Sequence, residues 1–301
     1  MTRPSSEYAL LGLLALLWGS SYLFGKVALT DIPPLTLAAT RVTLAAVMLL
    51  CVLRLQGASL PRGWPIWRVL LIQACFNSIG AWSILAWGQT QIDAALASVL
   101  NSTSPLFVFF ITLLITRHEA LSARKLLGAA IGVGGVATIV SHDLADGLDG
   151  SVLGAAAALF GAFLYGCAAV YGKRLSMLSP AASAAGTMLW ATAVLAPVAL
   201  IVDRPWTLAP SGTALGAALT LGLACTGAAL LLYFRLLRTL GSLGVASQSY
   251  LRAGFGAVLG VVVLGERLSP AMALGCVFAV VGVALMIQPA RKPLAVGRQA
   301  P

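Results

Sequence analysis

Ten long apolar segments follow one another along the chain, separated by short joints that carry polar residues or proline. A helix needs about 20 predominantly apolar residues to cross the hydrocarbon core of a membrane. Segments of this length lie at 8–29, 34–55, 66–88, 93–116, 123–141, 151–172, 181–203, 211–233, 242–264 and 270–287. The pattern therefore predicts an all-α integral membrane protein with ten transmembrane helices.

The composition agrees with this pattern. The chain has 301 residues, of which 59% are hydrophobic and 9% are charged. A soluble domain usually has charge on about a quarter of its residues, a need that lipid removes. The first apolar run follows a polar Met1–Ser6 segment and has no small-residue cleavage site behind it. We therefore interpret that run as a membrane span and not as a signal peptide.

Basic residues fall mainly on one set of alternate connections. If the N-terminus is cytoplasmic, that side holds fourteen of the nineteen Lys and Arg residues: Arg3, Arg54, Arg62, Arg68, Arg117, Arg124, Lys125, Lys173, Arg174, Arg235, Arg238, Arg291, Lys292 and Arg298. The opposite side keeps Arg204 and Arg267, with Asp143, Asp146 and Asp149 in one loop. This bias is the positive-inside signature of a bacterial-type inner membrane protein and predicts that both termini are cytoplasmic. Topology thus explains the net charge of +10, and we expect no nucleic-acid partner.

The two halves of the chain repeat one another at a constant offset of 147 positions, the separation of Lys26 and Lys173. The same offset relates Gly25 to Gly172, Pro33 to Pro180, Glu119 to Glu266, Gly128 to Gly275, Gly135 to Gly282 and Ala137 to Ala284. We expect five-helix repeats at 8–141 and 151–287 and a cytoplasmic tail at 288–301. Because each half has an odd number of spans, the halves would insert in opposite directions, a design that transporters use for alternating access. A duplicated scaffold without transport is the alternative.

Short motifs recur in the order and spacing of a known family. The first half has Trp18-Gly19-Ser20-Ser21, Ala97-Ser98-Val99-Leu100, Pro105, Glu119, Leu126-Leu127-Gly128-Ala129 and Gly135-Val136, and the second has Leu264-Gly265-Glu266-Arg267-Leu268, Leu274-Gly275 and Gly282-Val283. Over nearly the whole chain this arrangement resembles the EamA family of the drug/metabolite transporter superfamily. The resemblance implies a ten-helix exporter of small metabolites, most commonly amino acids, with the aromatic amino acid exporters as the most similar branch. The chain departs from the family at Arg252, the counterpart of Pro105, where the family commonly has proline.

Three basic side chains lie within predicted spans, where an ionisable group is costly. Lys26 is near the end of the first span, from which its long side chain can reach the interface. Arg41 lies about 10 Å into the second span at 1.5 Å per residue, where reaching the headgroups and packing on a partner carbonyl are equally compatible with the sequence. Arg252 lies near the middle of the ninth span. We expect it to face a water-filled cavity and to bind a carboxylate.

Polar residues gather at the same depth in the fourth and ninth spans. Pro105 has no amide hydrogen, so the carbonyl of Asn101 loses its helical partner, which is tolerated at this depth only against protein or a wet cavity. We expect Pro105 to break the helix and to act in gating, and Asn101, Ser102, Gln248 and Tyr250 to contact the substrate. The same polar groups are also typical of contacts that hold neighbouring helices together.

Aromatic side chains complete the expected site. The further substrate contacts are Trp18, Tyr22 and Lys26 on one face of the first span, Asn77 and Trp82 in the third and Tyr165 in the sixth. Each ring alone is typical of packing, whereas several rings beside amides and a cation form a pocket for an amphipathic solute. We expect a central cavity between helices 1, 3, 4, 6, 8 and 9 of the ten.

No Asp or Glu lies in the central part of any predicted span, which favours an anionic or zwitterionic substrate over an organic cation. Enzymatic, metal and phosphate-binding motifs are absent, so we expect no enzyme activity, metal or cofactor. The predicted function is export of amino acids, aromatic or otherwise neutral, by a monomer whose partners are the lipid bilayer and an amino acid-like solute. The alternatives are a multidrug or nucleotide-sugar carrier of the same superfamily and a non-transporting scaffold or receptor.

Overall fold

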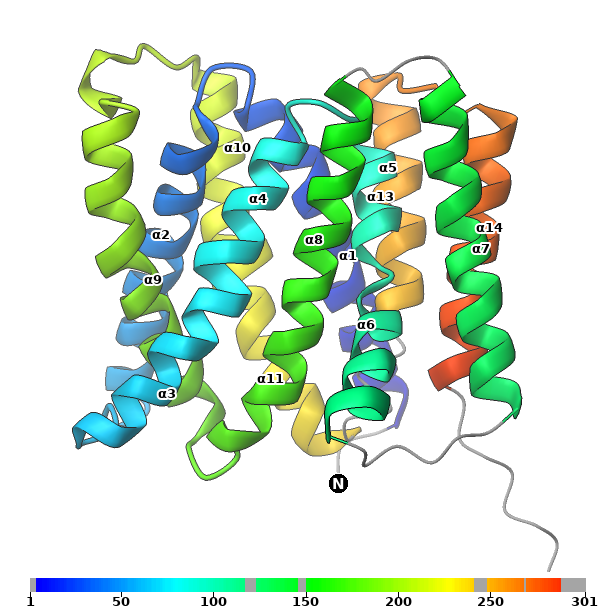
Figure 1. Cartoon of the computed structure of the whole chain (residues 1–301). Helices are drawn as coiled ribbons and strands as arrows, with labels where there is room; N and C mark the ends of the chain where they lie inside the picture. The colour runs from blue at the N-terminus through cyan, green and yellow to red at the C-terminus, as the bar shows by residue number, and fades with distance from the viewer. Residues whose placement is uncertain (1–3, 117–122, 146–149, 241–247, 268, 288–301) are drawn as a thin grey trace, which may run out of the picture.

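Helices stand side by side and form one bundle in the computed structural model, with their connections at its two ends (Figure 1). The structure describes residues 4–116, 123–145, 150–240, 248–267 and 269–287. Within these ranges every regular element is a helix. The expected tail at 288–301 and the repeated Glu119 lie outside the described residues.

Prolines and serines mark where many of the helices begin. The first half contains α1 (Pro4–Ala28), α2 (Pro34–Leu55), α3 (Trp64–Ala74), η1 (Cys75–Gly80), α4 (Ala81–Gly88), α5 (Ala94–Asn101), α6 (Ser104–Ile111), η2 (Thr112–Thr116) and α7 (Ala123–Ala145). The second contains α8 (Gly150–Tyr171), η3 (Gly172–Leu175), α9 (Pro180–Val202), η4 (Pro205–Thr207), α10 (Gly212–Gly222), η5 (Leu223–Ala228), α11 (Ala229–Thr239), α13 (Gln248–Leu264) and α14 (Pro270–Ile287). Pro34, Pro180 and Pro270 each open a helix, where the missing amide hydrogen costs nothing. Ser179 and Ser211 accept hydrogen bonds from first-turn amides as N-caps.

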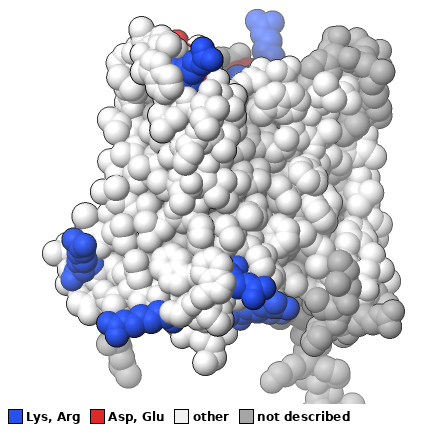
Figure 2. Space-filling view, turned by 60° about the vertical axis from the view of Figure 1, so that its left-hand side comes forward, with Lys and Arg blue, Asp and Glu red and all other residues white. Residues whose placement is uncertain are grey.

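Most of the predicted spans are present as long apolar helices. Seven described helices are long and apolar enough to cross a membrane: Ser6–Ala28, Pro34–Leu55, Trp64–Gly88, Ala94–Leu114, Val152–Leu175, Pro180–Val202 and Gly212–Tyr233. Shorter apolar helices run over Leu126–Thr138, Leu251–Leu264 and Ala273–Gly282. Figure 2 shows a wide uncharged band, with most of the visible Lys and Arg at the lower end of the molecule. The bundle therefore has the surface of an integral membrane protein.

The third span of each half contains a widened turn that the sequence pattern did not predict. These two spans are the α3–η1–α4 rod and the α10–η5–α11 rod. The π-helices η1 (Cys75–Gly80) and η5 (Leu223–Ala228) interrupt these rods, η1 between α3 and α4 and η5 between α10 and α11. They lie at almost equivalent positions under the offset of 147, since Gly80 and Gly227 occur near their ends. π-Turns of this kind are frequent at functional sites because they redirect side chains.

Close glycine contacts also occur at equivalent positions of the two halves. A Cβ atom built on Gly135 of α7 would lie 2.6 Å from the carbonyl oxygen of Gly275 in α14. A Cβ atom on Gly282, the counterpart of Gly135, would lie 2.5 Å from the carbonyl oxygen of Gly128. These glycines let α7 and α14 pack backbone to backbone within one chain, as expected for small residues at a helix crossing.

Carboxylates of the connecting segments bind the beginnings of helices from the other half. Asp31 accepts hydrogen bonds from the amide and hydroxyl of Ser211, at 2.9 and 2.5 Å. Asp203 accepts the corresponding pair from Thr36, at 2.7 and 2.8 Å. The hydrogen bonds from Ser211 hold the pKa of Asp31 below its usual range, so this carboxylate stays ionised at neutral pH. Both contacts place negative charge at the positive end of a helix.

Glu266 forms a third link of this type. Its two carboxylate oxygens accept the amide hydrogens of Ala94 and Ala95, at 2.7 and 2.9 Å, in the first turn of α5. Charge-assisted bonds to otherwise unsatisfied amides stabilise a helix start. The contact joins the α13–α14 connection to α5 across the two halves.

We expect the Glu266→Gln variant to lower the free energy of unfolding by about 1 kcal/mol, because an amide offers one acceptor oxygen where the carboxylate offers two. Thermal unfolding of the purified protein in detergent measures the effect. Arg267→Gln is the matched control, since this neighbouring side chain is exposed. Equal melting temperatures for the two variants would contradict the capping role.

Candidate functional site

A cavity of about 810 Å³ opens between the two halves of the bundle. Its walls come from α1, α2, the α3–η1–α4 rod, α6, α8, α9, the α10–η5–α11 rod and α13. No described residue of α7 or α14 lines it. The expectation of six lining helices was therefore too narrow, because α2 contributes Leu37, Ala38 and Arg41 and α9 contributes Ser183 and Thr187. The volume suits a small organic solute.

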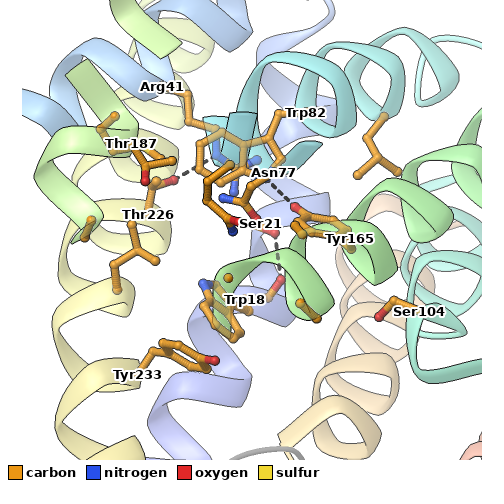
Figure 3. A pocket seen from close by; sticks show the side chains of 18 of the residues that line it. Trp18, Ser21, Arg41, Asn77, Trp82, Ser104, Tyr165, Thr187, Thr226 and Tyr233 are labelled. Carbon is orange, nitrogen blue, oxygen red and sulfur yellow. Dashed lines mark hydrogen bonds between the residues drawn. The ribbon is translucent and has the colours of Figure 1, made fainter. Parts of the chain in front are cut away.

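Arg41 is the charged centre of one wall. Its guanidinium carbon lies 4.0 Å above the ring centroid of Trp82, a cation–π contact. Its Nε donates a hydrogen bond of 2.8 Å to the hydroxyl of Thr226 in η5, and Thr226 in turn donates to the carbonyl of Leu221 at 2.7 Å. The indole nitrogen of Trp82 donates to the hydroxyl of Tyr165. Figure 3 shows these side chains converging from separate helices on one space.

The helix break before Pro105 supplies the environment of Arg252. The structure ends α5 at Asn101 and starts α6 at Ser104, so the expected break is present at this depth. An Nη of Arg252 lies 3.4 Å from the carbonyl oxygen of Asn101 and 3.5 Å from the hydroxyl of Ser102. Arg252, the second-half counterpart of Pro105, thus contacts the carbonyl that Pro105 frees.

The guanidinium of Arg252 is incompletely satisfied. Its buried Nε has no hydrogen-bond partner among the described residues, and its two Nη contacts are long and reach uncharged oxygens. A charged group in this state retains the capacity to bind an anion.

Two further aromatic groups shape the lower part of the cavity. The rings of Trp18 in α1 and Tyr233 in α11 lie 5.4 Å apart between centroids, and both line the space (Figure 3). Tyr22 is 6% exposed, and its hydroxyl accepts a hydrogen bond from the side-chain amide of Asn101. These rings offer an apolar surface beside the two cations.

The structure brings most of the expected site residues into this cavity. Those that line it are Trp18, Tyr22, Asn77, Trp82, Tyr165, Gln248 and Arg252. Asn101 and Ser102 lie behind it, where Asn101 holds Tyr22 and Ser102 donates to the carbonyl of Ser98 at 2.8 Å. The side chain of Tyr250 lies outside the described residues.

Lys26 has a different location from the one expected. Its Nζ donates hydrogen bonds of 2.8 Å to the carbonyl of Gln89 and 2.6 Å to that of Ile92. These carbonyls follow the end of α4, where a helix favours a cation. Lys26 therefore does not line the cavity, because the C-terminal end of α4 holds its ammonium group.

Sequence reasoning missed several polar residues of the wall: Ser21, Arg41, Gln73, Gln89, Ser104, Thr187 and Thr226. Arg41 carried a signal, since its depth in a span is unusual for a cation. No sequence pattern indicated Thr226, because its position in the cavity follows from the π-turn of η5.

The cavity is electropositive. Arg41 and Arg252 line it with Lys173 at one end, and among the described residues no Asp or Glu lines it. The fold and this cavity together define a multi-pass membrane transporter.

A family model described as the EamA-like transporter family matches residues 6–141 and 152–288. The chain therefore belongs to this family of the drug/metabolite transporter superfamily and resides in the inner membrane. The uncharacterized inner membrane transporter YedA of Escherichia coli (strain K12) is 31% identical over 277 residues, covering 90% of this chain and 88% of the relative. An uncharacterized transporter of Archaeoglobus fulgidus is 29% identical over 293 residues, covering 93% of this chain and 97% of that protein.

A solved structure titled "Crystal structure of protein" has the same fold. It superposes with a TM-score of 0.64 at 22% sequence identity, covering 94% of this chain and 98% of the other. The similarity extends over both halves of the bundle and concerns the fold alone.

Proposed function

We propose that this protein exports small amino acid-like metabolites across the inner membrane by alternating access. The observation that carries the proposal is the position of Arg252, which lines a membrane-embedded cavity with buried guanidinium nitrogen still available. A carboxylate is the natural partner of such a group, because it accepts two parallel hydrogen bonds from the planar guanidinium.

The aromatic walls favour a solute with an apolar part. Trp18 and Tyr233 pair at one side of the cavity, and Tyr165 lies at another (Figure 3). An amino acid bound through its carboxylate would place its side chain against such rings. Aromatic and other neutral amino acids are therefore included in the proposed range.

The proposed topology has ten spans, with both termini cytoplasmic and the two five-helix halves inserted in opposite directions. The seven long and three shorter apolar helices supply the spans. The first described helix begins, and α14 ends, at the same end of the bundle (Figure 1), the end where most visible basic residues lie (Figure 2). The positive-inside rule makes this end cytoplasmic.

A solute panel in proteoliposomes tests the proposal. Purified protein is reconstituted with one labelled amino acid inside, and exchange is measured against external amino acids, organic cations and nucleotide sugars, with and without a pH gradient. Selective exchange of carboxylate-bearing solutes supports the proposal. Preference for organic cations or nucleotide sugars would identify another branch of the superfamily, and absence of all flux would favour a scaffold or receptor.

A further inference from the structure

Arg41 has donor capacity that the protein does not use. One of its five N–H groups reaches Thr226 and its face stacks on Trp82, and no ion pair to it occurs within the described part of the chain. Its guanidinium lines the same cavity as that of Arg252. The cavity therefore presents two separate anion-binding groups.

Neither arginine is repeated at the equivalent position of the other half. At an offset of 147 positions, Arg41 corresponds to Met188 and Arg252 corresponds to Pro105. Each half thus supplies one cation where the other half has an uncharged residue. Packing shared by the two halves does not require either charge, which points to the solute as the reason for both.

The charges that line the cavity indicate the class of solute that it binds. Two guanidinium groups at membrane depth, with no carboxylate among the lining residues that the structure describes, make an environment in which a bound cation is repelled. A neutral zwitterion would satisfy one arginine and place its ammonium group near the other. A solute with two anionic groups satisfies both.

We propose that Arg41 forms a second anion subsite and that the cavity prefers solutes with two anionic groups, such as acidic amino acids and dicarboxylates. This inference rests on the proposed function, since it assumes that the cavity binds the transported solute. The second group is a carboxylate or a phosphate, which share the same guanidinium chemistry.

Competition in proteoliposomes tests the subsite. Exchange of labelled glutamate is measured against glutamate, malate, a phosphomonoester and phenylalanine, for the wild type and for Arg41→Gln, Arg41→Lys and Arg252→Gln. We expect Arg41→Gln to weaken dianionic solutes about tenfold and phenylalanine less than about threefold, with partial recovery in Arg41→Lys. Arg252→Gln should weaken all of them. The phosphomonoester distinguishes phosphate from carboxylate as the second group.

The outcomes separate this inference from the proposed function. Equal weakening of glutamate and phenylalanine in Arg41→Gln overturns the second subsite and leaves amino acid export intact. Absence of any carboxylate exchange by the folded wild type overturns the proposed function itself. The elution profile and melting temperature of each variant identify loss of folding, in which case Arg41→Lys decides, because it retains the charge.

A separate observation concerns the two repeated lysines at opposite ends of the cavity. At one end, the lining includes Gly25 and Gln89, and Lys26 binds the carbonyls of Gln89 and Ile92 beyond it. At the other end, the lining extends to Lys173 and Pro180 in the α8–α9 connection. Of these lining residues Gly25 and Gln89 are buried and Lys173 is exposed, so the cavity is covered at the Lys26 end and reaches the surface at the Lys173 end.

Lys173 is exposed and has no hydrogen-bond partner among the residues that the structure describes. The offset that relates it to Lys26 also relates α4 to α11, whose last turn ends at Thr239. The C-terminal carbonyls of α11 are thus the counterparts of those that Lys26 binds. If Lys173 bound these carbonyls while Lys26 released those of Gln89 and Ile92, one end of the cavity would close as the other opened.

We infer that Lys26 and Lys173 are alternating latches, each binding the end of the third rod in its own half when its side of the cavity is closed. Labelling tests this with Ser21→Cys, a cavity position, in a chain whose native cysteines are replaced by Ser. An impermeant maleimide is added from each side of the membrane. Lys26→Met should raise labelling from the Lys26 side about threefold, and Lys173→Met should lower it.

Two controls make the result decisive. Arg174→Met removes a neighbouring exposed charge outside the lining and should leave labelling unchanged. Lys26→Arg keeps a cation for the same carbonyls and should restore the wild-type pattern. Labelling that is insensitive to Lys26→Met from both sides would overturn the latch.

Discussion

The Arg252→Ala variant is expected to insert normally and to lose transport of amino acid-like solutes by about a hundredfold, since removing one partner of a buried charge pair costs 2–5 kcal/mol. The side chain is the group that the proposed function assigns to the carboxylate. Its contacts to Asn101 and Ser102 at 3.4 and 3.5 Å are weak, so the protein loses little structure with them. Solute exchange in proteoliposomes containing equal amounts of protein measures the loss.

Two further variants test whether the loss of transport is specific to the guanidinium of Arg252. Arg252→Lys retains the charge but not the planar pair of donors, and we expect intermediate transport. Arg267→Ala removes an exposed arginine that does not line the cavity and should transport at the wild-type rate. Unchanged exchange by Arg252→Ala would remove Arg252 from the site and with it the main support for carboxylate recognition.

The Gly282→Ala variant is expected to lose about 1–3 kcal/mol of stability, because the added methyl group overlaps backbone that has no rotamer to change. The new Cβ would lie 2.5 Å from the carbonyl oxygen of Gly128 and against the amide nitrogen of Gly132. To accept it, α14 must move away from α7. Thermal unfolding in detergent, followed by tryptophan fluorescence, measures the change.

Gly134→Ala is the matched control on the facing helix. A Cβ atom there meets nothing within 4 Å, so the substitution should be neutral or stabilise the helix by up to about 1 kcal/mol through its higher helix propensity. Since none of the described residues of α7 and α14 lines the cavity, the solute preference should remain that of the wild type in both variants. A Gly282→Ala protein as stable as Gly134→Ala would show that the helices do not depend on this contact.

The all-helical membrane fold could be predicted because its cause is local. Every window of about 20 residues must satisfy its backbone hydrogen bonds internally and present apolar side chains to lipid, so length and hydropathy report directly on the spans. The repeat was visible for a similar reason, since Gly135 and Gly282 both need close backbone approach at the same place in each half. Composition and spacing therefore decided the class of protein.

Part of the candidate site could also be predicted from the sequence of single helices. The depth of Arg252 and the missing amide of Pro105 are properties of single helices, and the structure places Arg252 beside the Asn101 carbonyl that Pro105 frees. The aromatic residues of the first, third and sixth spans line the same cavity. Whether they bind substrate remains a prediction that the variants above decide.

By itself, the sequence determined that this protein is a duplicated helical membrane protein with a deep cation, because those features follow from residue type and spacing. Only the tertiary structure decided which cations share the cavity. Contacts with Trp82 and Thr226, which are 41 and 185 positions away along the chain, place Arg41 in the cavity. Hydrogen bonds to the carbonyls of Gln89 and Ile92 hold Lys26 outside it. Contacts between residues so far apart arise from the packing of one helix against another, within the first half for Trp82, Gln89 and Ile92 and between the halves for Thr226, and no local pattern encodes them.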